Sequence, residues 1–118
     1  MPMSSIDACL EGIARANERI LAQPLDRRRE VIRERTVRVI VPDLATAFDM
    51  RLTVDGLTDI TSGPAAAAAA APQVRVTVSS DDLVDLAEDR LDPAKALFSR
   101  RLKVDASLSD LLRMRRLL

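Results

Sequence analysis

The last third of the chain, residues 73–118, constrains the fold most, because the spacing of its apolar residues changes repeatedly within a short length. Gln73–Ser79 alternates, with Val74, Val76 and Val78 on one face, which is the period of a half-buried strand. Two short stretches with helical spacing follow, then another alternating stretch, and finally a longer helical one. This order of strand-like and helix-like spacings predicts a small α+β domain.

Each helix predicted in this region has its own start signal. Ser79 is followed three residues later by Asp82, a spacing that caps a helix start. At Asp92-Pro93 the aspartate is a suitable cap, and the proline takes the first helical position, where its missing N–H costs nothing. Ser107 with Asp110 starts the last helix in the same way. The sequence therefore predicts a helix pair, a strand and a terminal helix after the strand at Gln73–Ser79.

The N-terminal 24 residues predict one amphipathic helix. Ser4 or Ser5 starts it, and Ser4 with Asp7 has the spacing of a capping box. Its apolar stripe is formed by Ile6, Leu10, Ile13 and Ile20, with Asn17 interrupting it. Gln23-Pro24 ends the helix. We expect it to pack on a face of a sheet, and the alternative is a helix that binds a partner or a membrane surface.

The middle of the chain predicts three antiparallel strands. Thr36–Val41 and Ala47–Val54 alternate between apolar and polar residues. Asp55-Gly56 is the strongest hairpin signal in the chain and leads into Leu57–Thr61. These three strands would form a meander.

Two connections flank this meander. Asp26–Glu30 is a charged stretch, which we interpret as a solvated loop, although its three arginines could also bind a phosphate or an acidic head group. Residues 63–72 are rich in alanine between two prolines, too short to nucleate a helix alone, and predict a loop.

Composition narrows the chemistry that one 118-residue domain can perform. There is no histidine and only one cysteine, Cys9, which excludes histidine-based catalysis, zinc sites and an internal disulfide, and fits a cytoplasmic protein. The 18 basic and 18 acidic residues balance, and only 2% of residues are aromatic, which argues against nucleic-acid binding. No apolar run is long enough to insert stably into a membrane. The excess of arginine and alanine suggests a bacterial genome.

We do not interpret the acidic cluster on the first helix of the pair as a functional site. The cluster consists of Asp81, Asp82, Asp85, Glu88 and Asp89. Acids near a helix start favour its dipole and form a solvated face, so we expect neither a metal site nor a catalytic site here. The Cys9 thiol is expected to pack between helix and sheet.

Residues 73–118 resemble the sterol carrier protein type-2 family of lipid-binding domains. The most specific match is Leu91–Phe98, LDPAKALF, which is similar to the family's Leu-x-Pro-x-Lys-Ala-Phe/Leu signature. Arg101-Leu102-Lys103-Val104 resembles the strand that follows it. The resemblance implies a stand-alone domain with a five-stranded, mostly antiparallel sheet covered on one face by helices. It also implies a hydrophobic tunnel between sheet and helices.

That tunnel would hold a fatty acid, a fatty acyl-CoA or a sterol-like lipid, without a cofactor and without chemistry on the ligand. Carried over by position, its lining would be Phe48, Met50, Leu52, Leu83, Leu86, Ala87, Leu97, Phe98, Leu102, Val104, Leu108, Leu111, Leu112 and Met114. Each of these residues also has ordinary core spacing. Arg113, Arg115 and Arg116 could meet a carboxylate or phosphate, or complement the dipole of the last helix.

The chain departs from the family pattern in three turns, where Asp89, Arg100 and Ala106 replace glycines. Glycine allows left-handed turns at low cost, so we expect these turns to be reshaped. The alternative function is an interaction subunit that keeps the fold without a tunnel, as a homodimer or with a partner enzyme. An apolar cavity of roughly 300 Å³ or more would favour the lipid carrier.

Overall fold

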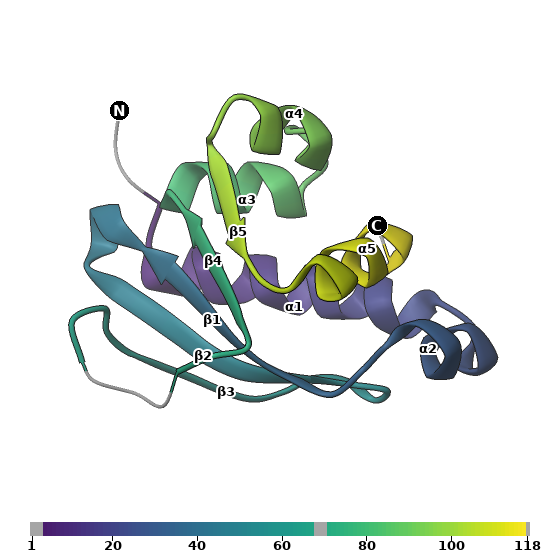
Figure 1. Cartoon of the computed structure of the whole chain (residues 1–118). Coiled ribbons are helices and arrows are strands. Elements are labelled where there is room, and N and C mark those ends of the chain that lie inside the picture. The colour runs from purple at the N-terminus through teal and green to yellow at the C-terminus, as the bar shows by residue number, and fades with distance from the viewer. Residues whose placement is uncertain (1–3, 68–70, 118) are drawn as a thin grey trace.

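A computed structural model describes residues 4–67 and 71–117 and contains one five-stranded sheet with helices gathered on one side of it (Figure 1). The strands lie in the order β3-β2-β1-β4-β5. Their bounds are β1 Arg35–Val41, β2 Thr46–Thr53, β3 Gly56–Pro64, β4 Val74–Val78 and β5 Leu102–Asp105. The helices are α1 Ile6–Ala22, α2 Leu25–Val31, α3 Ser80–Ala87, α4 Pro93–Phe98 and α5 Leu108–Leu117, with a 3₁₀ turn, η1, at Pro42–Leu44.

The pairing of the strands confirms the expected α+β fold with a mostly antiparallel sheet. β1, β2 and β3 form the predicted antiparallel meander, β5 is antiparallel to β4, and only β1 and β4 run parallel. The register aligns Val39 with Phe48 on one side and with Val76 on the other. Because side chains alternate between faces, this register gathers most apolar residues of the strands on one face, which we call the inner face.

The predicted helix starts are present, with one shift. The Oγ atoms of Ser79 and Ser107 each accept a hydrogen bond at 3.2 Å from an amide three residues on, and an oxygen of Asp92 accepts one from Ala94 at 3.2 Å. At α1 the cap is Ser5, which accepts from the amide of Ala8 at 3.0 Å. The expected capping box at Ser4 is absent, because the Ser4 hydroxyl donates instead to Asp81 at 2.7 Å.

The charged stretch after α1, predicted as a loop, is helical. It forms most of α2, which ends at the buried Val31 and is followed by the buried Ile32, 1% and 5% exposed. The Arg28 guanidinium donates to the carbonyls of Gln23 and Val54, at 3.0 and 2.6 Å. These tertiary contacts stabilise a helix that seven residues could not maintain alone.

The strand before the alanine-rich link is longer than predicted. β3 runs through Gly63 and Pro64, and the amide of Ala65 still donates to the carbonyl of Ala45 at 2.9 Å. The guanidinium of Arg38, 6% exposed on the outer face of the sheet, donates to the carbonyls of Ala65 and Ala67 and pairs with Asp49. The start of the expected loop is therefore tied to the sheet, while residues 68–70 lie outside the described part.

The two turns in which Asp89 and Arg100 replace glycines are not reshaped. Asp89 and Arg100 take φ values of 60° and 62°, the left-handed conformation that glycine prefers. The amide of Arg101 donates to the carbonyl of Ala96 and that of Arg100 to Leu97, the paired bonds of a Schellman motif. The same two bonds close α3 around Asp89. Our expectation was wrong there because backbone hydrogen bonding compensates for the strain of a side chain at positive φ.

Candidate functional site

The inner face of the sheet has a closed half and an open half. The closed half is a core of buried side chains from α1, α3 and the strands, formed by Cys9, Ile13, Val41, Phe48, Met50, Val78 and Leu83. The open half consists of inner-face and helix side chains that pack against this core but remain partly exposed, namely Val37, Val39, Leu57, Val76, Leu86 and Leu102. Val37, Val39 and Val76 belong to the central strand β1 and its neighbour β4, where full burial is the norm for a packed sheet.

The predicted lining residues divide among three environments. Four are buried: Phe48, Met50, Leu83 and Ala87. Four are partly buried on the same side: Leu52, Leu86, Leu102 and Val104. Five are exposed, on α4 and α5: Leu97, Phe98, Leu108, Leu111 and Leu112, with Phe98 at 95%. The side chain of Met114 lies outside the described part of the structure.

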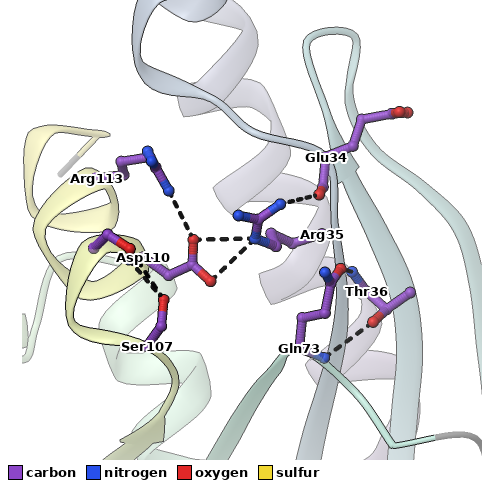
Figure 2. Close-up of polar contacts among 8 residues, drawn as sticks. Glu34, Arg35, Thr36, Gln73, Ser107, Asp110 and Arg113 are labelled. Carbon is purple, nitrogen blue, oxygen red and sulfur yellow. Dashed lines mark hydrogen bonds and ion pairs between the residues drawn. The ribbon is translucent and has the colours of Figure 1, made fainter.

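Helix α5 is attached to the sheet by a buried carboxylate (Figure 2). Asp110 is 6% exposed, and both its oxygens lie 3.0 Å from Nε of Arg35, at the start of β1, with Arg113 at 3.0 Å from the same group. Burial acts to raise the pKa of Asp110, but the bonds from Arg35 and Ser107 and the charge of Arg113 hold this pKa below its ordinary value. The carboxylate is therefore charged and paired over the whole neutral range.

Two further contacts of α5 are also polar. Arg27 on α2 donates to the carbonyl of Arg116 at 3.2 Å, and Arg116 pairs with Glu30 at 3.3 Å. By contrast, Leu108 and Leu112 are 72% and 54% exposed. Helix α5 therefore begins at the end of the sheet where β1 and β4 start, and it is held by charge rather than by buried leucines.

Two surface hollows lie outside the predicted tunnel. One, of about 330 Å³, lies under Ala71 and Pro72 and includes the outer-face residues Thr36, Asp49 and Arg51. Met50 is the one predicted lining residue that borders it. The other, of about 210 Å³, lies beside β4 and β5 and is lined by Pro42, Asp43, Thr77, Val78, Ser79, Arg100, Arg101 and Lys103. The larger exceeds the expected 300 Å³, but it includes outer-face residues and lies outside the tunnel that we predicted between sheet and helices.

Cys9 and the acidic residues Asp82 and Asp85 of α3 have structural roles. Burial, followed by the charges of Asp43 and Asp81, raises the pKa of the Cys9 thiol, which keeps it protonated and a poor nucleophile. The acidic face of α3 is paired: Asp82 with Arg101 and Asp85 with Arg90, and the bond from Arg101 lowers the pKa of Asp82. Within residues 4–67 and 71–117 no three potential ligands gather around a metal position.

Sequence reasoning missed the polar residues that dock the elements. Asn17, which seemed to interrupt an apolar stripe, accepts a hydrogen bond from the amide of Leu57 at 2.8 Å and ties α1 to the hairpin. A polar residue at a core position of a helix is a usable signal for such a bond. The pairing of Arg35 with Asp110, 75 residues apart, had no local signal at all.

The fold and this half-covered apolar face together define a class of α+β domain, and a comparison with known families identifies it. The model of the SCP-2 sterol transfer family matches residues 14–118, which is most of the chain. The chain therefore belongs to this family, as the resemblance in its last third indicated.

Solved structures support the same fold at low sequence identity. Sterol carrier protein 2 like 2 from Aedes aegypti is 17% identical, with a TM-score of 0.66, over 97% of this chain and 100% of that one. Its palmitated form, solved in solution, is 16% identical with a TM-score of 0.60, over 96% of this chain and 93% of that one. The ubiquinone synthesis protein UbiJ-SCP2 is 16% identical with a TM-score of 0.63, over 92% of this chain and 90% of that one. No curated protein sequence is significantly similar to this chain.

Proposed function

We propose that this chain is a non-catalytic lipid carrier that binds a fatty acyl or sterol-like ligand between the open half of the inner face and helix α5. The observation that carries the proposal is the contrast in how the inner face is covered. Its central residues Val39 and Val76 remain partly exposed, while the neighbouring α5 is fixed by ionic contacts. Uncovered apolar surface of this kind is what an apolar ligand would cover.

Helix α5 would act as the movable wall of the site. Leu108 and Leu112 of α5 are exposed rather than packed in the closed half, so α5 can move outward, with water then solvating Asp110 and Arg35, while the closed half stays intact. In an outward position its leucines and the inner-face valines would form the two sides of an apolar slot. Leu86, Leu102 and Val104 would then contact the ligand, as the sequence predicted.

The family favours a sterol-like lipid and one relative favours a fatty acyl chain as the ligand class. The family is described as a sterol transfer family, and the mosquito protein was solved in a palmitated form. The 2% aromatic content leaves an aliphatic slot, which suits a flexible acyl chain as well as a ring system. No helix among the described residues is long and apolar enough to cross a membrane. We propose that the carrier works in the cytoplasm.

The direct test is native mass spectrometry of the purified chain, with titration of a fluorescent palmitate analogue. We expect one ligand per chain. Val39→Phe should fill the slot and weaken binding by at least tenfold. Ile40→Phe, the neighbouring residue on the opposite face of β1, should leave binding unchanged. A chain that takes up neither lipid nor analogue, or equal weakening by both variants, would overturn the proposal.

One observation favours a second function, an interaction subunit with the same fold. The hollows of 210 and 330 Å³ border only one of the predicted lining residues, and apolar side chains on α4 and α5 are exposed. This function predicts a homodimer or a complex with an enzyme that covers these leucines. A dimer mass without bound lipid in the same spectrum would favour it over the carrier.

A further inference from the structure

Helix α4 carries the most exposed large apolar residue of the described chain. Phe98 is 95% exposed and its neighbour Leu97 is 46% exposed. The helix is anchored by Ala96, which is completely buried. Because residues two apart on a helix lie about 200° apart around its axis, the burial of Ala96 directs Phe98 away from the molecule. A packed position for the ring is therefore excluded by the way α4 docks.

Basic residues are concentrated in the sequence around this apolar tip. Residues 93–104 contain Lys95, Arg100, Arg101 and Lys103 and no acidic residue, in a chain whose overall charge is zero. All four side chains are exposed. The turn that ends α4 brings Arg100 and Arg101 directly behind Phe98, and both line the 210 Å³ hollow together with Lys103.

Most of these cations are not neutralised by the protein itself. Arg101 pairs with Asp82 at 2.5 Å, but Lys95, Arg100 and Lys103 form no ion pair within the described residues. Asp43, the one acid that lines the same hollow, accepts hydrogen bonds from the amide and hydroxyl of Ser80. The region therefore combines an exposed apolar residue with three cations that have no acidic partner among the described residues.

We propose that the tip of α4 docks the protein on an anionic lipid surface. An aromatic ring enters the headgroup region of a bilayer readily, and lysine and arginine beside it are attracted to anionic lipids. Two apolar residues are too few for a stable protein interface, which buries about 800 Å² on each partner. This docking does not require a bound ligand, so it stands or falls separately from the proposed carrier function.

The first test is binding of the purified chain to phosphatidylcholine vesicles with and without phosphatidylglycerol, measured by sedimentation. We expect binding only to vesicles that contain the anionic lipid. Each cation near such a surface strengthens binding about fivefold, so Arg100→Gln with Lys103→Gln should weaken it about 25-fold. The matched control is Arg29→Gln with Arg33→Gln, which removes two positive charges from exposed positions in α2 and between α2 and β1. It should have little effect on vesicle binding.

The second test places a fluorophore at the tip. The chain has no tryptophan and no tyrosine, so Phe98→Trp introduces a single reporter. Its emission should shift to the blue with anionic vesicles and stay unchanged with neutral ones, whereas Ile60→Trp, on the exposed part of β3, should not shift. No vesicle binding, equal weakening by both double variants, or a Phe98→Trp emission that does not respond would overturn the proposal.

Discussion

Helices α3 and α5 are attached to the rest of the molecule in different ways. Helix α3 buries Leu83 and Ala87 against α1, where Gly12 allows close contact: a Cβ at this position would lie 2.8 Å from Cδ2 of Leu83. Helix α5 instead buries a carboxylate, Asp110, and leaves Leu108 and Leu112 exposed. Dispersion and the hydrophobic effect hold the first helix, while ion pairs hold the second.

This difference separates stability from mobility within one small domain. Close-packed apolar contacts are lost all together, in global unfolding, whereas ion pairs can open locally at lower cost. The closed half is thus expected to set the free energy of unfolding, and the α5 region to open while the sheet stays folded. The following predictions test that division.

The largest effect is expected in the closed half. Phe48→Ala removes a completely buried ring and should lower the free energy of unfolding by about 3–5 kcal/mol. Leu112→Ala, at a site that is 54% exposed, should change it by less than about 0.5 kcal/mol. Urea unfolding followed by circular dichroism measures both. Similar losses for the two variants would show that α5 is as tightly packed as the core.

A second prediction concerns the contact between α1 and α3. Gly12→Leu inserts a side chain where Leu83 and the Cβ of Ala87, 3.2 Å from a Cβ at this site, already fill the space. Overpacking should cost about 1–3 kcal/mol in the same urea experiment. Ala14→Leu, at an exposed position of the same helix, is the control and should be nearly neutral. Tolerance of both leucines would mean that the two helices do not pack as closely as described.

The third prediction concerns the attachment of α5. Asp110→Asn removes the charge that pairs with Arg35 and should weaken docking of α5 by about 1–3 kcal/mol. Trypsin at neutral pH should then cut after Arg113 and Arg115 at least tenfold faster, without a matching loss of global stability. Asp105→Asn, an exposed acid at the end of β5, should not change the cleavage rate.

The same carboxylate predicts a pH dependence. Because the folded pKa of Asp110 is held below its ordinary value, its contribution is complete above the unfolded pKa of about 4 and is lost as the pH falls through the lower folded pKa. Amide NMR signals of α5 should therefore shift at acid pH before those of α1. In Asp110→Asn this early shift should be missing, and a simultaneous change of both helices in the unmodified chain would contradict local opening.

Local signals in the sequence predicted most of the elements but few of their contacts. The alternation of Val74, Val76 and Val78 predicted β4 and its inner face, because strand periodicity depends only on neighbouring residues. The helix α2 was missed because its stability comes from Arg28 binding the carbonyls of Gln23 and Val54. Asp26 in the first turn was a start signal for this helix that could have been used.

The sequence assigned the predicted lining residues to helices and strands, but it did not predict how buried each of them is. Leu83 and Phe98 have similar apolar spacing in the sequence, yet one is 8% and the other 95% exposed. The exposure of Phe98 depends on how α4 docks through Ala96. The apolar spacing within a six-residue helix cannot predict which side docks. The family resemblance predicted which helices and strands would line the tunnel. The ion pair between Arg35 and Asp110 was seen only in the structure.

The smallest predicted effects come from the turns that end α3 and α4. Arg100→Gly should raise the free energy of unfolding by about 0.5–1 kcal/mol, because it relieves a side chain at a φ of 62°. Asp89→Gly should gain less stability, because aspartate tolerates this conformation better than arginine does and because the variant loses the ion pair with Arg19. Ala106→Gly should gain nothing, because Ala106 does not take a positive φ. Thermal unfolding of the three variants measures this order, and equal effects in all three would show that backbone strain does not distinguish these turns.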